Sequence, residues 1–223
     1  MYKILTLNKI SPFGLGRFNK GKYTYGDDTE NPDAIMVRSA SMHDMDLPQS
    51  LLAIARAGAG VNNIPLEKCA QEGIVVFNTP GANANAVKEL VLAAMFLSSR
   101  NVPQAIEWCK TLKGEGERVA KLVEKGKSAF TGQEVLGKTL GIVGLGAIGI
   151  LVANTALALG MNVVGYDPYL SVSSALSIDP RVEVVSNIDE IFAVSDYISL
   201  HTPLNDSTRD LVNRVTISQM KDG

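Results

Sequence analysis

A glycine-rich turn gives the strongest chemical signal in the chain. Gly144, Gly146 and Gly149 form a G-x-G-x-x-G pattern that follows a predicted strand, Thr139–Val143, and opens a predicted helix, Ala147–Leu159. In this context the first glycine permits a tight turn, the second lets the backbone approach a pyrophosphate, and the third lets the helix pack closely on the strand. The N–H groups at the helix start attract phosphate. The pattern therefore predicts a dinucleotide site.

An acidic residue follows at the expected distance. Asp167 closes the next predicted strand, Asn162–Asp167, 18 residues after Gly149. A carboxylate at that place accepts hydrogen bonds from the adenosine ribose hydroxyls and repels a 2′-phosphate, so the pattern favours NAD over NADP. Two other interpretations stay open: a glycine-rich turn without a ligand, and a methyltransferase with an adenosyl cofactor, which also uses an acidic residue here.

Residues for acid–base or metal chemistry are few. The chain has two histidines, His43 and His201, and a catalytic imidazole needs a carboxylate to orient it. We expect His201, at a strand end, to have a positional role and His43 to lie on the surface, so we assign no catalytic residue within this chain. Cys69 and Cys109 lack metal-ligand spacing and are too few for a disulfide framework. We predict no metal site and two reduced thiols in a cytoplasmic protein.

Composition excludes several classes of protein. The 223 residues include 21 Lys+Arg and 23 Asp+Glu, a net charge of −2, which gives no electrostatic footprint for nucleic acid or an anionic membrane. With 46% apolar and 20% charged residues, the chain is expected to be globular. The stretch Thr139–Tyr166 is uncharged, but its glycines and polar residues favour a buried strand, turn, helix and strand over a membrane span.

Short apolar runs alternate with helical stretches, which predicts an α/β architecture. We place a domain boundary near Arg100, giving domains 1–100 and 101–223, and we expect the chain to stop within the second domain. A long apolar helix, Ala84–Arg100, and a second helix from Pro103 to about Glu124 carry more apolar surface than one small domain covers, which predicts a homodimer or higher assembly. The other expected strands are 3–7, 22–25, 34–37, 52–56, 74–77, 182–185 and 197–201; the other expected helices are 46–52, 66–71, 188–193 and 216–220.

Five ordered motifs resemble the D-isomer-specific 2-hydroxyacid dehydrogenases. They cover nearly all of the chain beyond Asn31: residues 37–39 (VRS), 56–64 (RAGAGVNNI), 77–83 (FNTPGAN) leading to Glu89, 144–149 with 165–168 (GYDP), and 200–204 (LHTPL) with 207–209 (STR). The resemblance implies a flavodoxin-like substrate (lid) domain followed by an NAD-binding Rossmann domain. It also implies that both domains are incomplete in this chain.

The resemblance also implies roles for single residues. It places Arg38, Ser39, Gly60 and Asn83 at the substrate, where a guanidinium suits a phosphate or carboxylate. The residues that it places at NAD are Ala59, Gly144, Gly146, Ala147, Ile148, Gly149, Asp167, Thr202 and Pro203. In the family, the catalytic Arg, Glu and His follow the His-Thr-Pro loop, beyond the residues present here.

Within the family, Arg38-Ser39 and residues 57–64 most resemble the phosphoglycerate dehydrogenases. This implies NAD-dependent oxidation of a small phosphorylated 2-hydroxy acid, 3-phosphoglycerate, in L-serine biosynthesis. Two alternatives stay open: a dehydrogenase for another D-2-hydroxy acid, such as lactate or glycerate, and a NAD-binding regulatory protein on the same fold.

Overall fold

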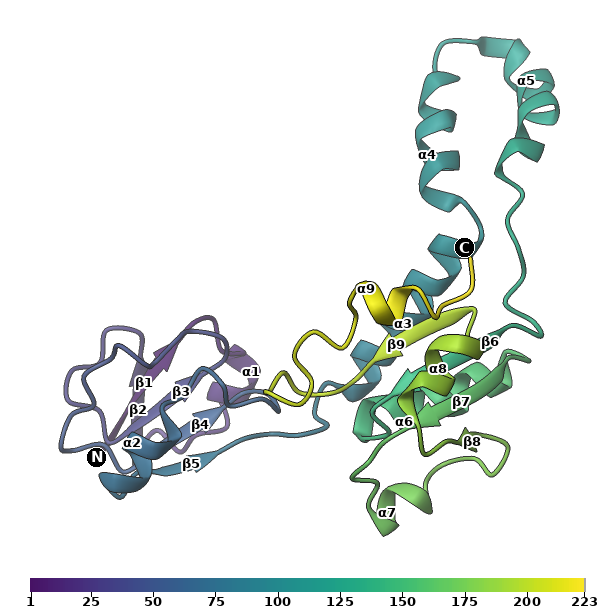
Figure 1. Ribbon diagram of the computed structural model, residues 1–223. Coiled ribbons are helices and arrows are strands. Elements are labelled where there is room, and N and C mark those ends of the chain that lie inside the picture. Colours follow the sequence, from purple (N-terminus) through teal and green to yellow (C-terminus); the bar gives the residue numbers. More distant parts are fainter. Residues whose placement is uncertain (223) are drawn as a thin grey trace. The chain divides into compact units, whose positions relative to one another are not determined.

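The computed structural model describes residues 1–222 and divides into two compact units, Met1–Asn83 and the chain from Ala84 onward (Figure 1). Each unit has its own parallel sheet with helices, which confirms the α/β class. The boundary lies at Ala84 and not near Arg100, because α3 (Ala84–Ser99) packs on the second unit. Met95 of α3 shares that unit's core with Leu140 and Val152.

Five parallel strands form the first unit in the order β2-β1-β3-β4-β5, which is the flavodoxin-like order that we expected. Alternate residues such as Leu5, Ile35 and Ile54 are buried on one face, together with Met42 and Cys69 from the connecting segments. The elements are β1 (Tyr2–Leu7), α1 (Pro12–Leu15), β2 (Tyr23–Gly26), β3 (Ala34–Val37), β4 (Ala53–Arg56), α2 (Leu66–Gln71) and β5 (Val75–Phe77).

The second unit is built on a four-stranded parallel sheet of order β8-β7-β6-β9, the start of the Rossmann strand order. Helices α3 and α6 pack on one face through a core that includes Leu140 and Ile142, and α8 packs on the other through Ile191. The elements are β6 (Thr139–Val143), α6 (Ala147–Ala158), β7 (Asn162–Tyr166), α7 (Val172–Ala175), β8 (Glu183–Val184), α8 (Ile188–Val194), β9 (Tyr197–Leu200) and α9 (Arg214–Ile217).

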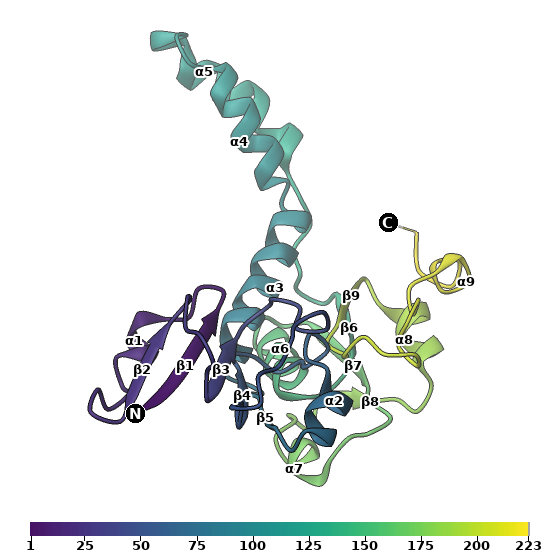
Figure 2. The ribbon, with the colours of Figure 1, turned by 90° about the vertical axis from the view of Figure 1, so that its left-hand side faces the viewer.

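A helical hairpin connects α3 to β6. Helices α4 (Val102–Thr111) and α5 (Val119–Gly126) run side by side (Figures 1 and 2). The short 3₁₀ turns η1 (Gly116–Arg118) and η2 (Lys127–Phe130) directly precede and follow α5. The prediction of a single helix from Pro103 to about Glu124 is wrong. Gly114 and Gly116 adopt φ values of +97° and +53°, which a right-handed helix cannot contain, so the chain turns back there.

Two further expectations need correction. No helix forms over residues 46–52, because Leu51 is buried in the first unit's core and the N–H of Leu52 donates to the carbonyl of Asp33. The short helices α1 and α7 fall in stretches that we expected to be loops. In the part of the chain that the structure describes, no helix is long and apolar enough to cross a membrane, and Thr139–Tyr166 forms β6, α6 and β7 as expected.

Candidate functional site

The glycine-rich turn lies between β6 and α6, and each of its glycines has a different environment. Gly144 adopts a φ of +97°, and a Cβ there would lie 2.7 Å from the carbonyl oxygen of His201. A Cβ on Gly149 would lie 1.9 Å from the carbonyl oxygen of Gly144, so the helix can approach the turn only with glycine at that position. A Cβ on Gly146 would meet no atom within 4 Å. The turn therefore keeps open space above Gly146, where a phosphate could reach the backbone.

A cavity of about 600 Å³ opens beside this turn, a volume typical of ligand sites. It brings together five of the residues assigned to the cofactor: Gly144, Gly146, Asp167, Thr202 and Pro203. The other lining residues are Val143, Tyr166, Pro168, Tyr169, Ile188, His201, Asn205, Ser207, Thr208 and Leu211. The assigned residues Ala147, Ile148 and Gly149 form the first turn of α6 and do not line the cavity.

Asp167 lies at the end of β7 and is half-buried. Its Oδ2 accepts a hydrogen bond of 2.9 Å from the N–H of Leu145, and its Oδ1 accepts one of 2.9 Å from the N–H of Tyr169. A carboxylate has about four lone-pair sites, so acceptor capacity for ribose hydroxyls remains. The contacts orient the carboxylate at the cavity and join it to the glycine-rich turn.

The loop after β9 is organised by two side chains that sequence reasoning did not single out. Asn205 Oδ1 accepts from the N–H groups of Ser207 and Thr208, at 3.0 Å and 3.1 Å, and Thr208 Oγ1 donates to the carbonyl of Pro203. This side-chain turn fixes the Thr202-Pro203 segment along the cavity wall. The signal that could have identified it is an asparagine two residues before the Ser-Thr pair.

Neither histidine contacts a carboxylate among the described residues. Nε2 of His201 lies 2.9 Å from Ser199 Oγ, and burial lowers the pKa of this imidazole, which favours its neutral form. Nε2 of His43 lies 2.9 Å from the carbonyl oxygen of Asn62. Both geometries suit a positional role, because a catalytic imidazole needs a carboxylate to orient it.

The residues assigned to the substrate lie in the first unit. Arg38 and Ser39 follow β3 and are exposed, and Arg38 makes no ion pair with any described residue. Gly60 lies in the turn after β4, where the N–H groups of Ala59 and Gly60 have no acceptor within residues 1–222. Asn83 is exposed and is the last residue of this unit. Ala59, assigned to the cofactor, also belongs to the first unit.

Arg56, the first residue of the motif 56–64, is a further site candidate for which the sequence predicted no role. It ends β4 beside Val37 of β3, and its guanidinium lies over Gly58, where a Cβ would be 1.7 Å from Nη1. Its Nε is buried without a hydrogen-bond partner. Its position could have indicated a binding role, because Arg56 is a cation at the carboxyl end of a predicted strand and ligands of open α/β sheets bind at that edge.

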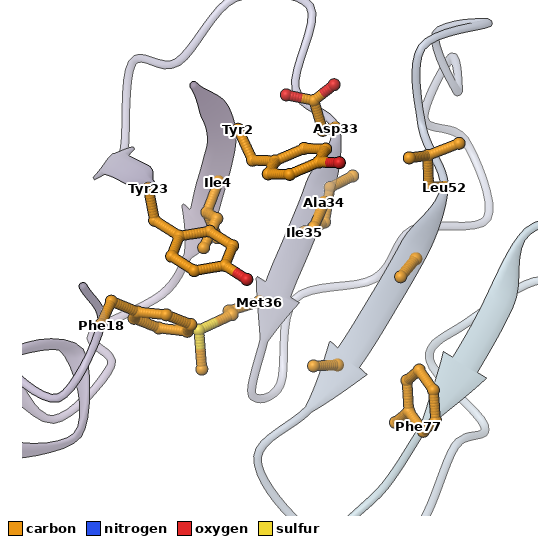
Figure 3. Close-up of a pocket in the computed structure, with 12 residues that line it drawn as sticks. Tyr2, Ile4, Phe18, Tyr23, Asp33, Ala34, Ile35, Met36, Leu52 and Phe77 are labelled. Carbon is orange, nitrogen blue, oxygen red and sulfur yellow. The ribbon is translucent and has the colours of Figure 1, made fainter. Parts of the chain in front are cut away.

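A second cavity, which is mainly apolar, lies in the first unit (Figure 3). It is on the face of the sheet opposite to the one that buries Leu5 and Ile54. Tyr2, Tyr23, Phe18, Met36 and Phe77 point into it, with Asp33 at its rim. None of the residues assigned to substrate or cofactor lines this cavity. It therefore offers mainly hydrophobic contact area, and its polar side chains are those of Tyr2, Tyr23 and Asp33.

Comparison with known proteins gives consistent matches. Residues 92–223 match the NAD binding domain of the D-isomer specific 2-hydroxyacid dehydrogenases. A hydroxypyruvate reductase of Thermotoga maritima is 42% identical over 86% of this chain and 58% of its own length, and a D-3-phosphoglycerate dehydrogenase of Methanocaldococcus jannaschii is 40% identical over 86% and 35%. The NAD⁺-bound 3-phosphoglycerate dehydrogenase of Entamoeba histolytica has a TM-score of 0.73 and 26% identity over 99% of this chain and 68% of that chain. The chain thus spans about a third to three fifths of the length of these two curated relatives.

Proposed function

The chain belongs to the D-isomer specific 2-hydroxyacid dehydrogenases, whose NAD-binding domain it contains, and from this premise we propose that the complete protein oxidises 3-phospho-D-glycerate to 3-phosphohydroxypyruvate. This reaction is the first step of L-serine biosynthesis. Relatives named D-3-phosphoglycerate dehydrogenase, 33% to 40% identical to this chain, support the proposal.

The observation that carries the choice of substrate is a pair of cations on neighbouring strands. Arg38 follows β3 and Arg56 ends β4, and the two strands pair in parallel with Val37 opposite Arg56. A substrate with both a carboxylate and a phosphate has two anionic groups, and a guanidinium binds either of them through two parallel hydrogen bonds. Ser39 adds a hydroxyl and Gly60 a backbone N–H at the same strand ends. Lactate or glycerate would use only one of the two cations.

The residues of the second unit fit a dinucleotide. Gly146 and the start of α6 present N–H groups for the pyrophosphate, and Asp167 presents its carboxylate for the ribose hydroxyls. Thr202 and Pro203 form part of the cavity wall. When bound, NAD accepts the hydride from the hydroxyl-bearing carbon of the substrate. The hydroxyl proton must leave in the same reaction, and this task needs an imidazole with a carboxylate partner.

Two alternatives have specific support. The hydroxypyruvate reductase relative favours a dehydrogenase for an unphosphorylated 2-hydroxy acid. A NAD-binding regulatory protein on the same fold would need only the cofactor residues of the second unit, such as Gly146 and Asp167.

Kinetic measurements on the complete protein would distinguish the proposed function from the two alternatives. We expect kcat/KM for 3-phosphoglycerate to exceed that for glycerate and lactate by more than about 100-fold, because a lost charge-assisted contact to the phosphate costs about 1.5–3 kcal/mol per hydrogen bond. Arg56→Met should narrow this ratio, whereas Arg17→Met, at an exposed arginine before β2, should not. Equal kcat/KM for glycerate would favour the first alternative, and NAD binding without turnover of any 2-hydroxy acid would favour the second.

We also propose a cytoplasmic homodimer. Cys69 and Cys109 are both free thiols, which suits a reducing compartment. Apolar side chains on α3 and α4 support self-association: Leu90, Phe96, Leu97, Val102 and Ile106 are all exposed in the single chain.

A further inference from the structure

Three asparagine side chains connect the loops at the carboxyl edge of the first sheet. The strands lie there in the order β1-β3-β4-β5, and each asparagine side chain joins the loop after one strand to the loop after the neighbouring strand. Asn8 follows β1, Asn63 lies in the turn after β4, and Asn78 follows β5. No sequence motif predicted these contacts, because their partners are 19 to 32 residues away.

Asn8 acts as an acceptor. Its Oδ1 receives hydrogen bonds from the N–H groups of Ser39, at 2.9 Å, and Ala40, at 2.7 Å. Asn8 adopts a φ of +67°, a left-handed conformation that asparagine tolerates better than most residues. The loop that carries Arg38 and Ser39 is thereby fixed to the end of β1.

Asn63 and Asn78 act as donors. Asn63 Nδ2 donates to the carbonyl of Ala40 at 2.8 Å, so that both backbone groups of Ala40 are held by side-chain amides. Asn78 Nδ2 donates to the carbonyl of Ala59 at 2.7 Å. Because backbone N–H groups only donate and carbonyls only accept, the partners identify which amide atom is oxygen and which is nitrogen.

The Asn78 contact sets the direction of a site group. In a trans peptide, the carbonyl and the following N–H point in opposite directions. Holding the carbonyl of Ala59 on Asn78 therefore turns the N–H of Gly60 away from β5, and this N–H has no acceptor among the described residues. A free, exposed backbone donor in a fixed direction is suited to bind a carboxylate.

We propose that Asn8, Asn63 and Asn78 are positioning residues for the substrate, which together hold the Arg38-Ser39 loop and aim the Gly60 N–H at the substrate's carboxylate. This inference rests on the proposed function only in requiring an anionic 2-hydroxy acid, with or without a phosphate. It assigns opposite hydrogen-bonding roles to chemically identical side chains, acceptor at Asn8 and donor at Asn63 and Asn78.

The test uses isosteric substitutions in the complete protein. Asn78→Asp replaces the donor by an acceptor facing a carbonyl, so we expect KM for the preferred 2-hydroxy acid to rise about 10- to 100-fold, with kcat within about threefold. Asn8→Asp adds the same charge at the same edge but keeps the acceptor, so we expect less than about a threefold change. Asn8→Gly keeps the left-handed backbone without the amide, and we expect it to raise KM about tenfold. KM for NAD should change less than KM for the 2-hydroxy acid in all three variants, because the residues assigned to NAD other than Ala59 lie in the second unit.

Amide hydrogen exchange gives a readout that does not need turnover. Without substrate, residues 57–63 should exchange faster in Asn78→Asp than in Asn8→Asp, because only the former frees the Ala59 carbonyl. Equal KM increases in the two Asp variants would assign the effect to charge and overturn the proposal, as would unchanged exchange in Asn78→Asp. Faster exchange in a protein that turns over no 2-hydroxy acid would support the asparagine contacts while refuting the proposed function.

Discussion

The Oδ2 atom of Asp167 accepts a 2.9 Å hydrogen bond from the backbone N–H of Leu145, the residue between the first two glycines of the turn. The acidic residue that follows β7 and the glycine-rich turn after β6 are therefore directly connected. A change at Asp167 is expected to affect the geometry of the turn as well as the contact to the ribose.

Asp167→Ala should reduce affinity for NADH and bring it closer to the affinity for NADPH. The lost hydrogen bonds to the ribose hydroxyls are charge-assisted, worth about 1.5–3 kcal/mol, and the repulsion of a 2′-phosphate disappears. Fluorescence titration of the complete protein with both cofactors measures this. Glu183→Ala, which removes an exposed carboxylate from the neighbouring strand β8, is the control. An unchanged NADH/NADPH ratio would contradict the role of Asp167.

Gly146→Ala should weaken NAD binding, whereas Gly149→Ala should lower the stability of the fold. A methyl group on Gly146 meets no atom within 4 Å, so the variant should keep its Tm but bind NAD more weakly. On Gly149 it would lie 1.9 Å from a backbone carbonyl, so α6 must move, at a cost of about 1–3 kcal/mol. Thermal unfolding without cofactor and NAD titration separate the two effects, and each variant is the control for the other. Equal Tm losses would show that the space above Gly146 is not open.

Ile106→Glu should shift the complete protein toward monomers. Ile106 is 51% exposed on α4, and burial of an unpaired carboxylate in an apolar interface is strongly unfavourable. Sedimentation at micromolar concentration measures the change. Lys113→Glu, in the exposed turn of the same hairpin, should leave the assembly intact. A wild-type protein that sediments as a monomer would refute the proposed homodimer.

Acid should destabilise the fold partly through His201. Burial lowers the pKa of His201, so the unfolded chain, where the pKa is about 6.5, binds the proton more readily than the folded chain. This contribution to stability is present above the unfolded pKa and is lost as the pH falls below it toward the lowered folded value. His201→Gln should therefore flatten the fall of Tm between about pH 7 and pH 5. A slope identical to that of the wild-type protein would contradict this assignment.

The chain of residues 1–223 by itself should have no appreciable dehydrogenase activity. Neither imidazole has a carboxylate partner among the described residues, and loss of a general base typically costs about 10²–10⁴ in rate. The measurement is NADH formation with 3-phosphoglycerate, beside the complete protein as a reference. Turnover within about tenfold of that reference would make His201 the leading candidate for the base.

Local sequence determined the parts of the protein whose chemistry depends on neighbouring residues. The uncharged stretch Thr139–Tyr166, interrupted by glycines and polar residues, predicted β6, α6 and β7 to within one residue, because a buried parallel strand and an apolar helix differ in length. The glycine-rich turn was identified for the same reason. The break between α4 and α5 was missed, because glycine tolerates a helix as well as a left-handed turn, and the packing of Trp108 on Phe130 and Gly126 across the hairpin joins residues 18 or more positions apart.

Tertiary structure alone decided which distant polar groups meet. Asn63 and Asn78 lie in motifs of the sequence and Asn8 does not, but nothing local assigns Asn8 as an acceptor and the other two as donors. Parallel pairing places the carboxyl ends of β1, β3, β4 and β5 at one edge, and their backbone groups must then find partners among the side chains that arrive there. Motif spacing predicted a dinucleotide site because Gly144, Gly146, Gly149 and Asp167 lie within one βαβ unit, whereas the asparagine contacts and the placement of Arg56 exist only once the whole sheet has formed.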